Sequence, residues 1–348
     1  MLKIDHAGIE VSSKELIVAL RREGKLKPWK SFPNTPGGHQ AIVRYLARQG
    51  HLVRVCLEST GIYGLDLALA LHAAPGIEVM VANPRAVRHF AQALMQRSKN
   101  DRLDAVVILE FAERMPFQAW QPPSPAARHL CALARRLEAL TELCAAEKNR
   151  LHAARATETS PSIIRRDLES SLRFHERAMQ RLEEEALKVI AQEPELQRKF
   201  DLLRSIRGIA QTSALQVLAG LAMLSPDLDV RQWVAYSGLD PREYSSGSSV
   251  HKKTRISKAG NRHLRRALYV PVPPCGMAAR REPHFRAYYE HLLARGKTKM
   301  QALVAVMRKL LHAIYGMFRH QMPFDGGKVY QLPQVVAANR ASCTKEVA

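Results

Sequence analysis

The order of strand patterns in the first 82 residues is the feature that most constrains the fold. Residues 4–20 read as a β-hairpin, and residues 29–33 supply a third strand candidate. The nearly continuous apolar runs at 51–57 and 77–82 are typical of buried central strands. Helical patterns occupy residues 39–49, 63–72 and the stretch from Pro84 onward. Hairpin strands followed by strand–helix units predict an α/β domain with a mixed sheet flanked by helices.

The sequence changes character after the stiff proline-rich segment 122–125. Two apolar stripes at helical spacing, Leu130–Leu151 and Leu168–Val189, flank a break at 157–161. They predict two long amphipathic helices, either an antiparallel hairpin or a coiled-coil dimerisation arm; the alternative is that both pack on the core. The third part is predicted to be mostly helical. The expected domains are therefore 1–125, 126–199, 200–325 and a loose tail at 326–348.

The charge balance points to a nucleic-acid partner. The chain has 53 Lys and Arg against 32 Asp and Glu, a net charge of +21, and a chain this basic usually meets a polyanion. Residues 244–281 contain no acid, which favours phosphate contact over a solvated face. The nine cations of this stretch are Lys252, Lys253, Arg255, Lys258, Arg262, Arg265, Arg266, Arg280 and Arg281.

Several classes of protein are disfavoured. The five cysteines form no C-x-x-C pair, which argues against a disulfide framework or a zinc knuckle and fits a reducing compartment. No secretory signal opens the sequence, and no apolar run reaches the roughly 18–20 residues of a membrane span. We therefore expect a soluble, cytoplasmic protein without a membrane partner.

Four acids stand at positions where carboxylates can gather. Glu10 lies in the first strand, Glu58 follows the buried strand, and Asp101 and Asp104 are spaced to share one helix face. Each has a simpler explanation: Asp101 could cap its helix, and Glu58 could cap the helix after the turn. Together they would repel one another unless Mg²⁺ or Mn²⁺ were bound, and two such ions can clamp a phosphodiester.

Two further segments could meet DNA. Ile206–Ala210 resembles one helix-hairpin-helix, in which Arg207 and Gly208 would present backbone N–H groups to a phosphate; the alternative is a plain packing turn. Residues 244–249 form a Ser- and Gly-rich loop ahead of the basic stretch. Its serines could supply a nucleophile, although such loops are more often only loops.

The order of several motifs resembles a known family. The N-terminal motifs are Gly-Ile-Glu-Val-Ser at 8–12, Leu-Glu-Ser-Thr-Gly-Ile-Tyr at 57–63, Val-Ala-Asn-Pro at 81–84 and Lys-Asn-Asp-Arg-Leu-Asp-Ala at 99–105. The C-terminal motifs are Gly208-Ile209, Tyr236–Pro241, Ser245–Gly247, Arg255–Asn261 and Leu264–Arg266. Over roughly residues 1–320 the chain resembles DEDD-type transposases of bacterial insertion sequences, a group described as bridge-RNA-guided serine recombinases.

This resemblance implies a fold and a mechanism. It implies an RNase-H-like, RuvC-like N-terminal domain whose metal-binding acids are Glu10, Glu58, Asp101 and Asp104, a helical arm for dimer or tetramer formation, and a C-terminal domain with Ser246 as nucleophile. Ser246 is preferred over Ser245 because the family's serine directly precedes a glycine. Ser246 would cut DNA, hold it as a phosphoserine linkage and pass it to a partner strand, while a structured RNA would select donor and target.

One position departs from the family pattern. The first acid is usually Asp, whereas position 10 is Glu, and the additional methylene moves the carboxylate by about an ångström. Asp5 is no substitute, because its place on an alternating strand points it to the opposite face.

Two other functions remain open from the sequence. A metal-dependent Holliday-junction resolvase or nuclease would need the four acids but not Ser246. A non-catalytic nucleic-acid-binding remnant of a mobile element would need neither.

Overall fold

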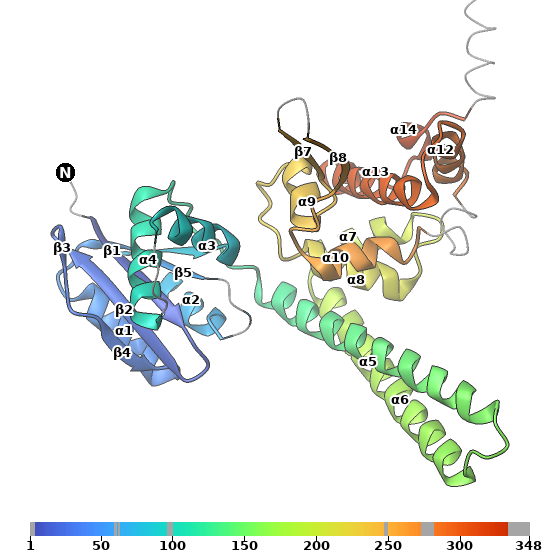
Figure 1. Cartoon of the computed structure of the whole chain (residues 1–348), viewed down its shortest axis with the longest axis horizontal. Coiled ribbons are helices and arrows are strands. Elements are labelled where there is room, and N and C mark those ends of the chain that lie inside the picture. The colour runs from blue at the N-terminus through green and yellow to red at the C-terminus, as the bar shows by residue number, and fades with distance from the viewer. Residues whose placement is uncertain are drawn as a thin grey trace, which may run out of the picture. The chain divides into compact units, whose positions relative to one another are not determined.

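The computed structural model describes residues 4–58, 61, 63–95, 100–246, 250–272 and 282–332, and the side chains of Ser246 and residues 250–253 lie outside this description. The chain divides into two compact units, residues 1–122 and 123–348 (Figure 1). Each unit has its own hydrophobic core.

The first unit is built on one mixed sheet. Its strands are β1 (Ile4–Val11), β2 (Glu15–Arg22), β3 (Lys25–Leu26), β4 (Lys30–Pro33), β5 (Leu52–Glu58) and β6 (Ile77–Ala82). The order is β3-β2-β1-β5-β6, and β4 also pairs with β2. The first strands are antiparallel hairpin strands, whereas β5 runs parallel to β1 and to β6. The sequence predicted this mixed sheet, apart from β3.

Helices cover both faces of the sheet (Figure 1). They are α1 (Pro36–Ala47), α2 (Leu65–His72), α3 (Pro84–Ala93) and α4 (Asp101–Arg114). Alternate residues of β1, such as Ala7 and Ile9, pack with α1 and α2, and the opposite face packs on α4. The strand order and the layering fit the RNase-H-like architecture that the sequence implied.

The second unit begins with a helical arm. Its helices are α5 (Pro125–Arg155) and α6 (Ser162–Gln192). They run antiparallel, because Cys144 lies beside Met179, at 3.8 Å between the sulfur atoms, and Arg155 pairs with Glu169 at 2.6 Å. The antiparallel hairpin is therefore the intramolecular arrangement, and pairing between two copies of the arm stays a prediction.

The remainder of this unit is mostly helical. Its helices are α7 (Pro194–Arg204), α8 (Gln211–Leu221), α9 (Val230–Ser237), α10 (Arg262–Tyr269), α12 (Pro283–Ala294), α13 (Lys299–His320) and α14 (Gly326–Val329). They enclose a core that includes Leu215, Leu264 and Ile314. One β-hairpin, β7 (Pro241–Ser246) with β8 (Val250–Ile256), was not predicted. Among the described helices, none combines the length and apolarity needed to cross a membrane.

Candidate active site

Helix α4 rests directly on the backbone of β1 at Gly8. A Cβ atom at Gly8 would lie 2.2 Å from the carbonyl oxygen of Ala105 and 2.2 Å from the amide nitrogen of Leu109. No real side chain tolerates such distances to backbone atoms, so glycine is what allows the helix and the strand to touch here. This contact fixes the height of α4 above the sheet.

A second contact shows in which direction α4 runs across the sheet. Arg21 is paired across the sheet with His6, near the start of β1, and its guanidinium forms ion pairs with Glu110 and Glu113 in the second half of α4. The end of α4 therefore lies over the start of β1. The helix runs antiparallel to the strand, and its first turn lies at the carboxyl end of β1.

These two contacts bring the predicted acids to one edge of the sheet. Glu10 is two residues beyond Gly8, about 7 Å along the strand, and Asp101 is four residues before Ala105, about 6 Å along the helix. Asp104 is in the same turn of α4. Glu58 ends β5 one position beyond the pair Ile9–Leu57, in register with Glu10. The sheet places both glutamates on the α4 face, because Gly8 and Cys56 form a register pair and both pack against α4.

The electrostatics of Cys56 agree with this placement. Burial, and after it the negative charge of Glu58 two residues away, raise the pKa of its thiol to about 12. Glu58 therefore projects its charge along the α4 face of β5. Within the described residues, however, no three acidic, histidine or cysteine side chains come close enough together to hold a metal ion.

Neither Asp101 nor Glu58 is the N-cap residue of the helix that follows it. The side chain of Asn100, not Asp101, caps α4 by accepting a hydrogen bond from the Leu103 amide at 2.9 Å. The N-cap residue of α2 is Gly64, six residues beyond Glu58. Arg102 lies over the Trp29 ring, with 3.7 Å from its guanidinium carbon to the ring centroid, and anchors the first turn of α4.

The half-buried amide of Asn34 holds the loops that follow the two glutamates. Asn34 donates hydrogen bonds to the carbonyl oxygens of Ser12, at 2.8 Å, and Tyr63, at 3.1 Å. The Oδ1 atom of Asn34 is in turn hydrogen-bonded to His39 Nε2 at 2.7 Å. Burial lowers the pKa of His39, which keeps the ring neutral. The sequence showed Asn34 only as a turn residue before a helix, so this role was missed.

Asp5 belongs to a different part of the domain. It is 1% exposed and accepts a hydrogen bond of 2.9 Å from Arg22 Nε, and Arg22 also donates to the Leu46 carbonyl oxygen. These partners lie on the α1 side of the sheet. The prediction that Asp5 points away from the candidate site is confirmed.

Ser246, the predicted nucleophile, ends β7 in the second unit. In the β7–β8 register it pairs with Val250, and Ser245 pairs with His251. The expected loop is thus the end of a β-hairpin. In β8 the residues Val250, Thr254 and Ile256 lie at alternate positions, but Lys252 interrupts them, so the strand pattern is weak in the sequence.

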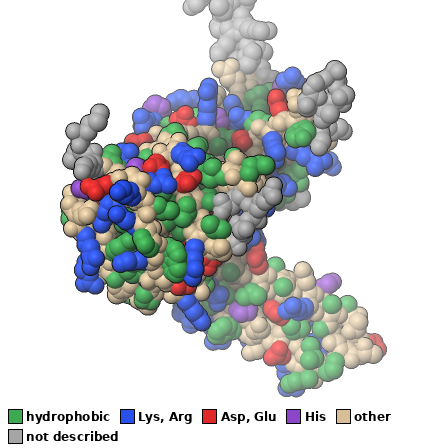
Figure 2. Space-filling model, turned by 60° about the vertical axis from the view of Figure 1, so that its left-hand side comes forward, with side chains coloured by type: hydrophobic (Ala, Val, Ile, Leu, Met, Phe, Trp, Pro, Cys, Tyr) green, Lys and Arg blue, Asp and Glu red, His purple; other side chains and the backbone are tan. Residues whose placement is uncertain are grey.

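The predicted phosphate-binding cations fall into three groups. Arg255, Lys258 and Arg262 are exposed. Arg265 and Arg266 make structural contacts: Arg265 donates to the Ser237 carbonyl oxygen at 2.9 Å, and Arg266 forms ion pairs with Glu138 and Glu142 of the arm. The side chains of Lys252 and Lys253 lie outside the described residues, as do Arg280 and Arg281. On the face shown in Figure 2, Lys and Arg side chains are spread over each unit.

The predicted phosphate-binding turn lies between α7 and α8. Gly208 has a φ of 101°, a conformation that glycine adopts without strain, and Arg207 beside it is exposed. The N-cap of α8 is Ala210, which offers no side-chain acceptor to the first amides of the helix. Those amides and Arg207 are the groups that a phosphate would contact.

Known proteins match the chain in two segments and along most of its length. A model of DEDD-type IS110 transposases matches residues 7–155, and a model described as Transposase IS116/IS110/IS902 family matches residues 200–290. A pilin gene-inverting protein of Moraxella bovis is 29% identical over 302 residues, covering 85% of this chain and 90% of the relative. The 43.6 kDa protein of insertion element IS110 from Streptomyces coelicolor is 31% identical over 118 residues, 34% of this chain and 28% of that protein. Among solved structures, Thermus thermophilus RuvC in complex with a Holliday junction substrate aligns with 33% of this chain and 98% of its own, at 18% identity and a TM-score of 0.27.

Proposed function

Because the chain belongs to the IS116/IS110/IS902 family of DEDD-type transposases, we propose that it cuts and rejoins DNA with the four acids of its first unit and Ser246 of its second. The role of the four acids is supported by the close contact of α4 with Gly8. Because of this contact, Asp101 and Asp104 lie at the sheet edge that also holds Glu10 and Glu58.

The four acids fit a divalent cation of the Mg²⁺ or Mn²⁺ type. Carboxylate oxygens are the donors that these hard cations prefer, and the acids come from three elements at one sheet edge. When bound, the cations would polarise a phosphodiester and stabilise charge on its attacking and leaving oxygens. The acids repel one another, so we expect the side chains to draw together only with the cation present.

Ser246 is the proposed nucleophile. Its hydroxyl oxygen attacks the phosphorus atom, an Oγ–P bond forms, one P–O bond of the DNA breaks, and the hydroxyl proton passes to the departing sugar oxygen. A sugar hydroxyl of the partner strand then attacks the phosphoserine diester and releases Ser246 unchanged. Each step exchanges one phosphate ester for another, so no external energy source is needed. The family match to residues 200–290, which include Ser246, supports this assignment.

Sequence selection is proposed to come from a structured RNA. The exposed cations Arg255, Lys258 and Arg262 with the Arg207–Gly208 turn would hold phosphates, which positions nucleic acid without reading its sequence. Base pairing with the RNA would supply the reading.

The arm is proposed to join copies of the chain into a dimer or tetramer. Ile163 and Phe174 of α6 are 62% and 59% exposed, and Figure 2 shows hydrophobic side chains at the surface of the arm. Large exposed apolar side chains are typical of association surfaces.

The test uses a plasmid that carries the gene with its native flanking DNA. Glu58→Gln and Asp104→Asn should each reduce strand cleavage more than about 100-fold, because each removes one charge that holds the cation. Glu113→Gln, on the far end of α4, is the matched control and should change the rate less than about threefold. The proposal would be contradicted if Glu58→Gln, assayed in the presence of a chelator, cleaved DNA as fast as the parent does with Mg²⁺.

A further inference from the structure

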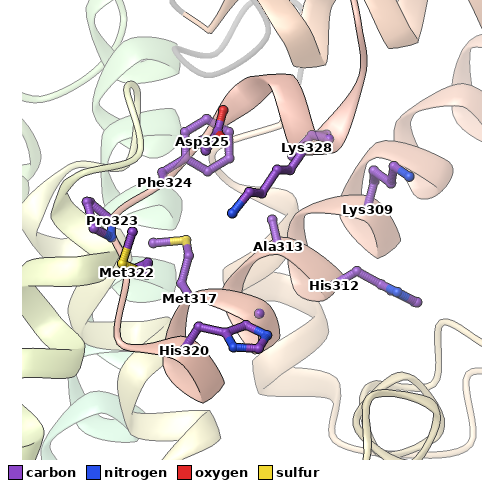
Figure 3. A pocket seen from close by; sticks show the side chains of 12 residues that line it. Lys309, His312, Ala313, Met317, His320, Met322, Pro323, Phe324, Asp325 and Lys328 are labelled. Atoms are coloured by element: carbon purple, nitrogen blue, oxygen red, sulfur yellow. The ribbon is translucent and has the colours of Figure 1, made fainter.

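A hollow in the second unit is lined by none of the predicted site residues. It is formed by the second half of α13 and the segment that runs through α14, and it has a volume of about 200 Å³ (Figure 3). Ala313, Met317 and Phe324 give it apolar walls. Lys309, Lys328 and His312 also line it. The hollow therefore combines apolar surface with two ammonium groups.

The two lysines are available to an anion. Within the described residues, neither Lys309 nor Lys328 forms an ion pair; Lys309 only approaches the ring of Tyr288, at 5.9 Å. The one carboxylate in the lining, Asp325, accepts a hydrogen bond from the Gly327 amide at 3.0 Å and caps α14. In Figure 3 Lys328 extends toward Met317 and Ala313, whereas the side chains of Lys309 and His312 point away from Lys328.

His312 gives an independent sign of a missing partner. Its Nε2 atom is buried and has no hydrogen-bond partner in the described structure. Burial lowers the pKa of this ring, and the neighbouring Arg308 and Lys309 charges lower it further, so the ring is neutral near pH 7. A buried polar atom of this kind is costly unless a ligand or water satisfies it.

The size of the hollow limits what it can hold. Pockets for whole small molecules typically measure about 300–1,000 Å³, so this one suits a smaller flat group. A free phosphate would leave the apolar walls unused. A nucleobase would contact the walls, and its attached phosphate would reach Lys328. Phe285 stacks on Phe324 with centroids 5.6 Å apart and fixes the orientation of that ring.

The hollow also adjoins the predicted phosphate-binding turn. The backbone amide of Phe324 donates a hydrogen bond of 3.0 Å to the Ser205 hydroxyl, at the end of α7. Arg207 and Gly208 follow two and three residues later. A strand whose backbone is held at this turn therefore passes next to the hollow.

From these contacts we propose that the hollow binds one unstacked nucleotide of a single-stranded nucleic acid, with the base against Met317 and Phe324, the phosphate at Lys328, and Lys309 as a second positive charge at the rim. This inference rests on the proposed function, because it requires that the second unit binds nucleic acid. Enzymes that act on nucleic acids commonly take single bases out of the stack and hold them in such pockets. The ligand chemistry is the same for RNA and for displaced DNA.

The experiment measures binding of 12-nucleotide single strands of DNA and RNA, each made intact, with one abasic site, and with 2-aminopurine as a reporter of unstacking. Lys309→Gln with Lys328→Gln removes the two ammonium groups. Lys297→Gln with Lys299→Gln removes two exposed lysines just before or at the start of α13 and is the matched control. Ala313→Met fills the hollow without changing charge. Thermal melts confirm that each variant folds.

The parent should bind the intact strand about 10-fold more tightly than the abasic strand, and 2-aminopurine fluorescence should rise on binding. The Lys309/Lys328 variant should bind about 10-fold more weakly and its salt slope should fall by roughly one unit, whereas the Lys297/Lys299 control should stay within about threefold. Ala313→Met should bind intact and abasic strands alike. The DNA and RNA arms show which strand is held.

Equal binding of intact and abasic strands by the parent, or equal weakening in both lysine pairs, would overturn the proposal. Should Ala313→Met not fold, the abasic comparison and the lysine pairs decide alone. Plasmid cleavage is measured on the same samples: a parent that cuts DNA but fails the abasic comparison refutes only the pocket, whereas a parent that binds no nucleic acid refutes the proposed function.

Discussion

Gly8 of β1 lies against Ala105 of α4 so closely that an added Cβ would be 2.2 Å from the Ala105 carbonyl oxygen. The strand that carries Glu10 and the helix that carries Asp104 are thereby in backbone contact. The contact between Gly8 and Ala105 thus determines that the four acids lie at the same edge of the sheet.

Gly8→Ala should therefore displace α4 and disturb the site. We expect a decrease of about 1–3 kcal/mol in the free energy of unfolding, because backbone atoms cannot move aside as a flexible side chain would, together with a large decrease in cleavage. Gly37→Ala is the control: a Cβ there meets nothing within 4 Å. It should be neutral or slightly stabilising. Urea denaturation and plasmid cleavage measure both effects, and an active, fully stable Gly8→Ala protein would refute the role of this contact.

The sequence predicted the sheet well because its signals are local. The alternation in β1 and β2 and the apolar runs of β5 and β6 depend only on which faces are buried. The positions of the four acids near the ends of their elements follow from the same local signals, and their role as metal ligands stays a prediction. The Gly8–Ala105 contact and the Asn34 hydrogen bonds could not be predicted, because they join segments far apart in the chain.

The second unit was harder to predict. The two long apolar stripes predicted α5 and α6, and the rest of the unit was predicted only as mostly helical. The β7–β8 hairpin was missed because the cations of β8 outnumber its apolar residues, so the alternation of Val250, Thr254 and Ile256 is a weak signal. The ion pairs of Arg266 with Glu138 and Glu142 span more than 120 residues, so no local pattern could separate this arginine from the exposed cations.

Asp5 provides a stability prediction that is independent of activity. Asp5→Ala leaves the Arg22 guanidinium buried without its carboxylate, and breaking such a buried pair typically costs about 3–5 kcal/mol. The change should lower the urea midpoint strongly. At a temperature where the variant is still folded, its metal requirement for cleavage should match that of the parent. A destabilisation under about 1 kcal/mol would show that the pair contributes little.

Glu10 tests the departure from the family pattern. Glu10→Asp should preserve or raise cleavage, because it restores the shorter acid that the pattern usually has at this position. Glu10→Gln keeps the length of the side chain and removes its charge, so it should lose activity. Rates at several Mn²⁺ concentrations compare the three proteins. Equal rates for all three would remove Glu10 from the site.

The acid-free stretch predicts a specific salt dependence. Reversing Lys252, Lys253 and Arg255 to Glu should weaken binding to duplex DNA and reduce the salt slope by about one unit for each phosphate that the protein no longer neutralises. Reversing Lys14, Lys25 and Arg48 changes the net charge equally on exposed positions of the first unit and is the control. The same slope in both triple variants would mean that only total charge matters.

The covalent step at Ser246 is the most direct test of the proposed mechanism. Labelled plasmid fragments carrying the native flanking DNA are incubated with Mg²⁺ and the parent, Ser246→Ala or Ser245→Ala protein, and then separated on a denaturing gel. We expect a protein–DNA adduct with the parent, a weaker adduct with Ser245→Ala, and none with Ser246→Ala, although all three bind the DNA equally. Cleavage or a covalent adduct with Ser246→Ala would contradict the serine mechanism and would favour the metal-dependent resolvase alternative.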